Sequence, residues 1–133
     1  MCGIIGITSS KPVSSAIINS LRKLEYRGYD SAGLATLSEG IINEVKSEGR
    51  VENLEKNIAI KNMQGSVGIG HVRWATHGIP NTVNAHPHSS NNVSVVHNGI
   101  IENSTILKKF LISKGHKFKS QTDTEVIVHL ITE

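Results

Sequence analysis

The sequence predicts a single domain of the α+β class, in which antiparallel strands are covered by helices. Apolar runs at 34–37 and 41–45 flank Ser38-Glu39-Gly40, a pattern typical of a β-hairpin and therefore of antiparallel pairing. Amphipathic segments with helical spacing lie on both sides of this hairpin. The length of 133 residues allows one compact unit with a core of moderate size.

The first half of the chain is predicted to alternate between strands and helices. Residues 2–8 form a short apolar run that indicates a buried strand. Lys11-Pro12 then opens a helix that ends near Arg27-Gly28. The apolar residues that recur at helical spacing in it are Val13, Ile17, Leu21 and Leu24. One polar helix is expected over 51–60, and a strand over 67–72.

The second half begins with a long polar loop, a feature that is usually functional, before a strand expected at 93–97. Helical spacing predicts a helix over 102–113, which Gly115 ends in the left-handed conformation. Thr122 and Glu125 form a capping-box pattern before an apolar helical segment. No stop signal follows this segment, so we expect the 133 residues to be part of a longer fold.

Composition is typical of a soluble globular protein, with 38% hydrophobic and 19% charged residues. Much of the net charge of +3 comes from a lysine cluster. Its members are Lys108, Lys109, Lys114, Lys117 and Lys119. Stacking aromatics do not recur along it, which favours a solvated face over a nucleic-acid surface. With no apolar run of about 18 residues and no signal-peptide pattern, we expect a cytoplasmic protein with no membrane or nucleic-acid partner.

The only cysteine, Cys2, directly follows the initiator methionine. It has no disulfide partner in the chain and must act as a thiol or thiolate. Removal of Met1 would give Cys2 a free α-amine of pKa about 7.7 to 8.0, able to accept the proton of a thiol of pKa about 8.5. The thiolate could then attack an amide carbon and form a thioester. The alternative is an inert buried cysteine, the commoner case for this feature alone.

A thioester route needs hydrogen-bond donors for the oxygen that becomes negative. Asn98-Gly99 follows a predicted strand and can supply a side-chain amide and a backbone N–H that converge on one point. The alternative is a hairpin turn, because Asn-Gly is the strongest short hairpin signal. The helical pattern that follows Gly99 argues against a returning strand.

A free amino acid as substrate calls for one fixed cation and one fixed anion. Arg73 lies at the end of a predicted strand, where its guanidinium could hold a carboxylate with two hydrogen bonds. Asp123 could hold an ammonium group. From first principles Asp123 could equally be a helix-terminus charge favoured by the macrodipole.

Five histidines within a short stretch raise the alternative of a metal site. They are His71, His77, His86, His88 and His97. No pair has the i, i+4 spacing of a zinc enzyme helix, and the one cysteine is far away in sequence. We therefore expect neither a metal nor another cofactor.

Several segments, in order and spacing, resemble the class II glutamine amidotransferases. The matching segments are residues 2–6, 24–35, 71–78, 84–88, 96–103 and 122–125. The wordings Tyr-Arg-Gly-Tyr-Asp-Ser-Ala-Gly and Arg-Trp-Ala-Thr-His-Gly favour the branch that transfers ammonia to fructose 6-phosphate over the amidophosphoribosyltransferase branch. The resemblance covers nearly the whole chain.

This resemblance implies an N-terminal nucleophile hydrolase fold, a four-layer αββα sandwich, and hydrolysis of glutamine to glutamate and ammonia. It implies Cys2 as the nucleophile, with Asn98 and Gly99 as the oxyanion hole. The residues implied to contact the substrate are Arg73, Thr76 and His77 at the carboxylate end, Asp123 at the ammonium, Trp74 as a gate for ammonia, and Arg27 and His86 in the lining.

The family's glutaminase domain is longer than this chain and is followed by a sugar-phosphate isomerase region. The resemblance therefore implies that residues 1–133 are the N-terminal part of the glutaminase domain, truncated at its C-terminal side. Fructose 6-phosphate would bind only through the absent region, and the full-length enzyme is expected to be a homodimer. The alternative is a catalytically inactive fragment or interaction piece that retains the family motifs.

Overall fold

The fold is known from a computed structural model, which describes residues 1–133 apart from the side chain of Ile58. The strands are β1 (Gly3–Thr8), β2 (Ser31–Ser38), β3 (Ile41–Glu48), β4 (Val67–Arg73), β5 (His88–Ser90) and β6 (Val93–Val95). The helices are α1 (Ser14–Leu24), the 3-10 turn η1 (Glu25–Arg27), α2 (Val51–Glu55), α3 (Ile58–Lys61), α4 (Ser104–Ser113) and α5 (Glu125–Thr132).

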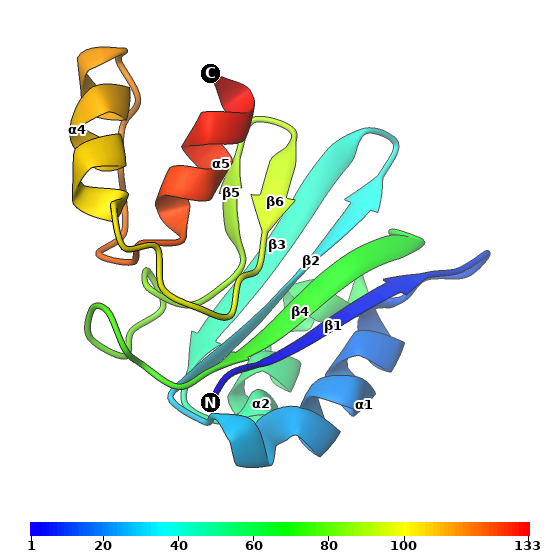
Figure 1. Ribbon diagram of the computed structural model, residues 1–133. Helices are drawn as coiled ribbons and strands as arrows, with labels where there is room; N and C mark the ends of the chain where they lie inside the picture. The colour runs from blue at the N-terminus through cyan, green and yellow to red at the C-terminus, as the bar shows by residue number, and fades with distance from the viewer.

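Two antiparallel sheets lie between two helical layers (Figure 1). The larger sheet has the strand order β1-β4-β2-β3, and β5 pairs with β6 in the smaller one. Helices α1 and α2 cover the outer face of the larger sheet, whereas α5 packs on β5 and β6 with α4 beside it. The predicted α+β class and four-layer αββα arrangement are therefore confirmed.

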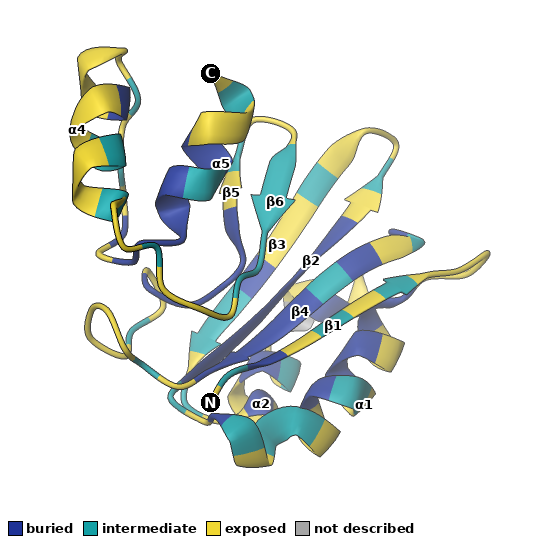
Figure 2. Ribbon diagram, in the orientation of Figure 1, coloured by how far each residue is buried: buried dark blue, intermediate teal, exposed yellow. Residues whose placement is uncertain are grey.

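The main hydrophobic core lies between α1, α2 and the larger sheet (Figure 2). The predicted inner face of α1 is confirmed, because Val13, Ile17 and Leu21 are almost completely buried there. They pack with Leu34 of β2 and Val72 of β4. Burial of each large aliphatic side chain contributes about 1.5 to 3 kcal/mol, which fixes α1 against the sheet.

The predicted hairpin is confirmed as β2 and β3, and Gly115 has the expected positive φ, at 97°. The long polar loop is only partly a loop, because it contains β5, which pairs with the expected strand at β6. The single helix expected over 51–60 is divided into α2 and α3. The break occurs because Asn57 accepts a hydrogen bond from the backbone N–H of Ala59 and starts a new helix.

The capping-box prediction at Thr122 and Glu125 was wrong. The Glu125 carboxylate accepts hydrogen bonds from the backbone N–H groups of Lys119 and Ser120 instead, at 2.8 and 2.7 Å. The hydroxyl of Thr122 lies 2.8 Å from Nε2 of His88. The Glu125 contacts tie the segment before α5 to the first residue of the helix, and the Thr122 contact ties the same segment to β5.

The two faces of strand β4 have different surroundings, the hydrophobic core on one side and polar side chains on the other. In the β1–β4 ladder Gly3 pairs with Val72, whose side chain is fully buried in the core. Because side chains alternate along a strand, His71 and Arg73 point to the opposite face, toward the smaller sheet. The segment around His86 approaches this face so closely that a Cβ at Gly33 would lie 2.1 Å from the His86 carbonyl oxygen. Glycine at position 33 therefore allows the two layers to meet.

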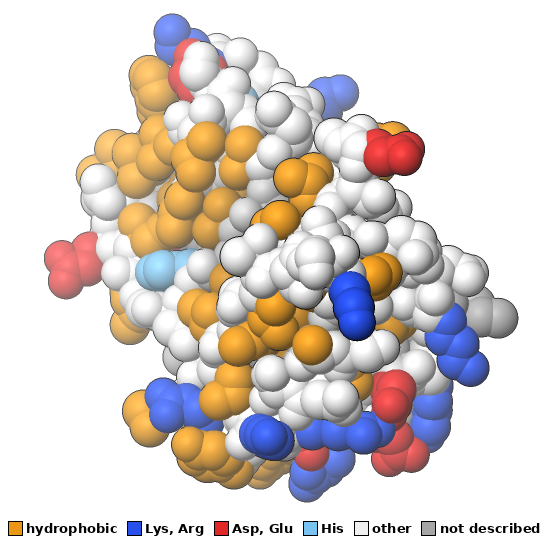
Figure 3. Space-filling model, turned by 90° about the vertical axis from the view of Figure 1, so that its right-hand side faces the viewer, with side chains coloured by type: hydrophobic (Ala, Val, Ile, Leu, Met, Phe, Trp, Pro, Cys, Tyr) orange, Lys and Arg blue, Asp and Glu red, His pale blue; other side chains and the backbone are white. Residues whose placement is uncertain are grey.

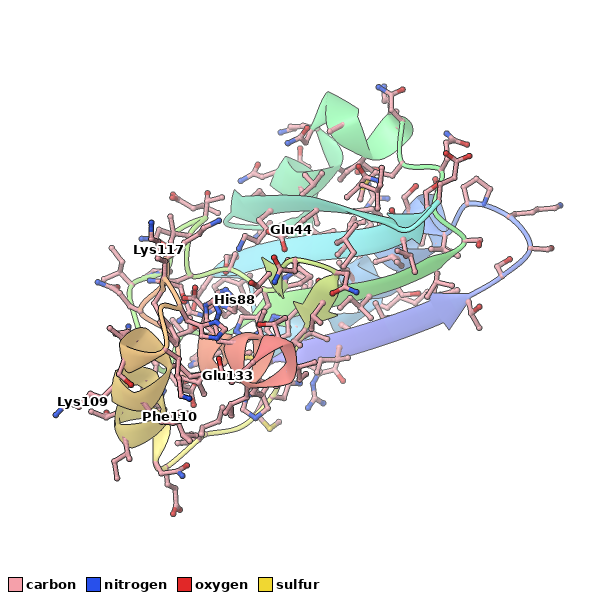
Figure 4. All side chains as sticks on the ribbon, turned by 90° about the horizontal axis from the view of Figure 1, so that it is seen from above. Glu44, His88, Lys109, Phe110, Lys117 and Glu133 are labelled. Carbon is pink, nitrogen blue, oxygen red and sulfur yellow. The ribbon has the colours of Figure 1, made fainter. Side chains whose placement is uncertain are left out.

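Two phenyl rings of the lysine-rich region are covered by lysines of the same chain. The Lys108 Nζ lies 4.9 Å from the ring centroid of Phe118, and the Lys114 Nζ lies 5.7 Å from that of Phe110. Figure 4 shows Lys109 extending from α4 away from the protein. Both rings therefore make cation–π contacts with lysines of their own chain.

Hydrophobic side chains gather over much of the face shown in Figure 3. Large apolar side chains that remain exposed include Ile4, Leu37, Val67, Leu130 and Ile131.

None of the helices in the described part of the chain has the length and hydropathy that a membrane span requires.

Candidate active site

All ten residues proposed from the sequence line one cavity of about 350 Å³ between the two sheets. They are Cys2, Arg27, Arg73, Trp74, Thr76, His77, His86, Asn98, Gly99 and Asp123. They come from six separate segments of the chain, which the fold brings together at one end of β1 and β4. Met1 also lines the cavity, directly before Cys2.

The Cys2 thiol is held at the start of β1 by backbone contacts. Its Sγ accepts a hydrogen bond from the backbone N–H of Trp74 at 3.1 Å and lies 3.4 Å from the Trp74 carbonyl oxygen. The Arg27 Nε donates to the carbonyl oxygen of Cys2 at 3.0 Å. Cys2 is only partly buried, unlike the inert packing cysteine considered as the alternative.

Asn98 and Gly99 do not form a hairpin turn. The smaller sheet ends at Val95, and the chain continues from Gly99 to α4 without a returning strand. Gly99 has a φ of +150°, and a Cβ at this position would lie 2.9 Å from Nε2 of His97. A larger residue is therefore disfavoured here. The Asn98 side chain lies at the cavity with its Oδ1 2.9 Å from Nε2 of His71.

Asp123 does not cap α5. The residue at the N-cap is Thr124, and no side chain caps this helix. The Asp123 carboxylate instead accepts a hydrogen bond from the backbone N–H of Ile101 at 2.7 Å. This bond links the segment before α5 to the segment that carries Asn98 and Gly99, and it places a negative charge at the cavity.

The Arg73 guanidinium is largely buried and already has hydrogen-bond partners. It donates to the backbone carbonyl oxygens of His77, Gly78 and Ile79, the last at 3.2 Å. Burial lowers the pKa of Arg73, which the negative charges of nearby acidic groups, including Asp123, partly oppose. Arg73 therefore fixes the loop after β4 in addition to supplying positive charge to the cavity.

The loop after β4 carries three of the proposed substrate contacts. Trp74 is half exposed and packs edge-on against Tyr29, with 6.1 Å between ring centroids. Thr76 and His77 are exposed at the cavity mouth, with 3.3 Å between the Thr76 Oγ1 and the His77 Nδ1. Asp30 holds this loop, because its carboxylate accepts a hydrogen bond from the Ala75 N–H at 2.7 Å.

Sequence reasoning missed residues that hold the cavity-lining segments in place. Asp30 lay within a quoted motif without a role, and only its contact with Ala75 reveals one. His97 lines the cavity, and its Nδ1 lies 3.1 Å from Oγ1 of Thr124. His71 was considered only as a metal ligand. No sequence pattern signals such roles, because each depends on a contact between distant segments.

Three of the five histidines pack together in a buried cluster, which we call the histidine stack. The rings of His71 and His86 are nearly parallel with centroids 4.2 Å apart, and the ring of His88 follows at 4.8 Å from His86. Figure 4 shows His88 beside α5, on the side of the helix that faces Glu44 of β3. In the described residues no three His, Cys, Asp or Glu side chains are arranged to hold a metal ion.

Burial keeps the stacked histidines neutral. It lowers the pKa of His71 to about 4 and that of His88 to about 3, and it lowers the pKa of His86 further. Neighbouring positive groups add to these shifts, whereas the Asn98 side chain opposes the shift of His71 and Glu125 that of His88. The charge of each imidazole is disfavoured because water cannot reach it.

Acid is expected to destabilise the protein through this stack. The pKa of His71 is about 4 in the folded state against 6.5 in a solvated chain, so only the unfolded chain binds a proton between these values. Stability is therefore full above pH 6.5 and is lost as the pH falls toward 4, by about 2 kcal/mol per stacked histidine from pH 7 to pH 5. Urea denaturation at both pH values measures this loss.

A pair of variants distinguishes the contribution of the histidine stack to this pH dependence from that of other titrating groups. His88→Phe should reduce the difference between pH 7 and pH 5, because one buried imidazole is removed. His77→Gln, at an exposed histidine, should leave it unchanged. Equal unfolding free energies of the wild-type protein at the two pH values contradict the prediction.

The fold is that of a glutamine amidotransferase domain of the N-terminal nucleophile hydrolase type. Residues 56–133 match the glutamine amidotransferase domain family, and the chain belongs to this family. A solved structure of glutamine phosphoribosylpyrophosphate amidotransferase from B. subtilis, in complex with ADP and GMP, superposes with a TM-score of 0.84. It is 29% identical, and the match covers 100% of this chain and 29% of that chain.

The sequence relatives carry a different name from this structural neighbour. The chain is similar to glutamine–fructose-6-phosphate aminotransferases (isomerizing) of Clostridium acetobutylicum, 56% identical over 133 residues, and Mesorhizobium japonicum, 52% identical over 131 residues. Each match covers 98% of this chain and 22% of the relative. The relative from Pyrococcus horikoshii is 54% identical over 135 residues, with 100% of this chain and 23% of the relative covered. The chain thus spans less than a quarter of the length of these curated relatives.

Proposed function

We propose that this protein hydrolyses the side-chain amide of glutamine with Cys2 as the nucleophile. The observation that carries the proposal is the convergence of a thiol, an Asn-Gly pair and a buried carboxylate on one cavity of the size of a small ligand. Membership of the glutamine amidotransferase domain family supports the choice of glutamine as the substrate.

The proposed reaction starts after removal of Met1, which gives Cys2 its own α-amine. The amine accepts the thiol proton, and Sγ attacks the amide carbon of glutamine to give a tetrahedral intermediate. The Nδ2 of Asn98 and the N–H of Gly99 donate hydrogen bonds to its negative oxygen. The amine returns the proton to the leaving nitrogen, ammonia departs, and water hydrolyses the thioester to glutamate and the free thiol.

The remaining residues of the cavity are proposed to recognise the amino-acid end of the substrate. Arg73, Thr76 and His77 face the carboxylate, and Asp123 pairs with the ammonium. Arg73 brings positive charge to the same cavity as the negative charge of Asp123, which matches the two charges of a free amino acid. Trp74 is proposed to gate the release of ammonia, and Arg27 holds the backbone of Cys2.

The acceptor of the ammonia is proposed to be fructose 6-phosphate, which is named for the sequence relatives. In this proposal residues 1–133 form the N-terminal part of a glutaminase domain. The exposed apolar side chains of β1 and α5 support further packing partners for this part of the fold. We also propose that a sugar-phosphate isomerase region follows the glutaminase domain in the full-length enzyme. This enzyme is proposed to be a homodimer in the cytoplasm.

Labelling with an electrophilic glutamine analogue that carries a diazoketone in place of the amide tests the proposal. We expect one adduct by intact mass in the protein that carries this sequence, located by peptide mapping at Cys2 after loss of Met1. Glutamine should slow the labelling by competition. A folded protein that gives no adduct, or an adduct at another residue, would refute the proposed site.

Selective acetylation of the Cys2 α-amine tests whether this amine carries the proton in the proposed reaction. It should abolish glutamine hydrolysis while the thiol still reacts with a small alkylating reagent. Continued hydrolysis after acetylation would show that another base serves Cys2. A folded protein with no hydrolysis before acetylation would instead favour the inactive interaction piece.

A further inference from the structure

His71 lies behind the cavity wall, in contact with one of the proposed oxyanion donors. Its side chain is completely buried and does not line the cavity. Its Nε2 lies 2.9 Å from Oδ1 of Asn98. Asn98 is an exposed residue that lines the cavity. This contact joins β4 to the segment after β6, across the two sheets.

The surroundings of His71 determine which ring nitrogen carries the proton. Its other nitrogen, Nδ1, is buried and has no hydrogen-bond partner among the described residues. A proton on Nδ1 would be a buried donor without an acceptor, which costs about 1 to 3 kcal/mol. A proton on Nε2 is satisfied by Asn98, so the Nε2–H tautomer is favoured.

This tautomer fixes the orientation of the Asn98 amide. With Nε2–H as the donor, the atom that faces His71 must be the acceptor Oδ1. The amide nitrogen Nδ2 is then directed away from His71 and is available to the cavity. A flipped amide would present Oδ1 to the developing negative charge and would repel it.

The histidine stack holds the ring that makes this contact. His86 lies parallel to His71 at 4.2 Å, and His88 behind it is anchored to Thr122 at 2.8 Å. Arg73 and His97 also act on His71, and a backbone contact with His97 favours the protonated ring, but no group in the described part of the chain lies within hydrogen-bonding geometry of Nδ1. The hydrogen bond that another side chain makes to the ring of His71 is the one with Asn98.

We infer that His71 is a positioning residue for the oxyanion hole: its Nε2–H holds the Asn98 amide with Nδ2 directed into the cavity. The inference rests on the proposed glutaminase function and adds a residue that touches neither glutamine nor the thiol. It assigns the buried imidazole a role in the rate of amide cleavage rather than in the binding of substrate.

Two variants of His71 separate the hydrogen bond from the packing of the ring. His71→Phe keeps an aromatic ring in the stack and removes the donor, whereas His71→Gln keeps an N–H donor and removes the ring. We expect His71→Phe to lower kcat for glutamine hydrolysis by roughly 10- to 100-fold, with KM changed less than about 3-fold. His71→Gln should retain the higher kcat of the two. The opposite order would assign the effect to packing and overturn the inference.

A double-mutant cycle with Asn98→Ala gives the decisive comparison. Once the Asn98 amide is absent, His71→Phe should lower kcat by less than about 3-fold, because nothing remains to be positioned. An equal loss in both backgrounds would show an independent structural role and would refute the inference. The rate of Cys2 alkylation by iodoacetamide, which needs no oxyanion hole, should be unchanged in every variant.

The tautomer can be observed in the wild-type protein, so the inference remains falsifiable if a variant does not fold. Nitrogen-15 NMR of histidine-labelled protein should find the His71 proton on Nε2, and a proton on Nδ1 would overturn the inference. Failure of the proposed function is distinguished because the wild-type enzyme would then not hydrolyse glutamine at all. Failure of the inference alone leaves an active enzyme with the outcomes described above.

Discussion

Replacement of Cys2 by alanine is expected to lower the rate of glutamine hydrolysis by about 10⁴-fold or more, because no other group can form the thioester. Within the residues that the structure describes, Cys2 contributes the sole thiol to the cavity. Glutamate release at saturating glutamine measures the effect, in protein whose Met1 removal has been verified by mass.

The matched control for this prediction is Cys2→Ser, which changes a single atom. It should fold with the same thermal midpoint, since the Trp74 N–H can donate to Oγ in place of Sγ. It should still be severely impaired, because a hydroxyl is a much weaker nucleophile near neutral pH. Glutamate release by Cys2→Ala at the wild-type rate would remove the thiol from the mechanism.

Replacement of Asn98 by alanine is expected to lower kcat by about 10²- to 10³-fold with little change in KM. The removed amide donor acts on the oxygen only once this atom becomes negative, so its loss affects the transition state more than substrate binding. Steady-state kinetics of ammonia release separates the two constants. A rise in KM at constant kcat would assign Asn98 to substrate binding instead.

Asp123→Asn provides the contrast for this second prediction. The asparagine Oδ1 can still accept the hydrogen bond from Ile101, so the local backbone is retained while the charge is lost. KM should therefore rise by about 10-fold or more, as expected for a lost charge-assisted contact with the ammonium. Two variants that line one cavity should thus change different kinetic constants.

Local patterns in the sequence predicted much of the fold. The hairpin of β2 and β3 follows from its turn residues, and the buried face of α1 follows from helical spacing. Strand β5 was missed because its three residues, His-Ser-Ser, carry no apolar alternation. Its position depends on pairing with β6 and packing against α5, which no local pattern reports.

In the candidate site, too, some residues could be predicted from local patterns and others could not. The residues proposed to have direct chemical roles could be named from the sequence because nucleophiles, oxyanion donors and charged groups have recognisable types and motifs, and all of these residues line the cavity. Their supports were not predicted. Glu125 was interpreted as a capping residue, but its carboxylate binds the backbone of Lys119 and Ser120. Asp30 and His71 act on residues 45 and 27 positions away.

The register of β1 against β4 sets the geometry of the proposed active site. Gly3 lies opposite Val72, so Cys2 is placed beside the end of the strand that carries His71 and Arg73. A slip of one residue would turn Val72 outward and both polar side chains into the hydrophobic core. Any chain that folded with this error would lose its core and its reactive centre together, so selection against misfolding and selection for turnover act on the same few backbone hydrogen bonds.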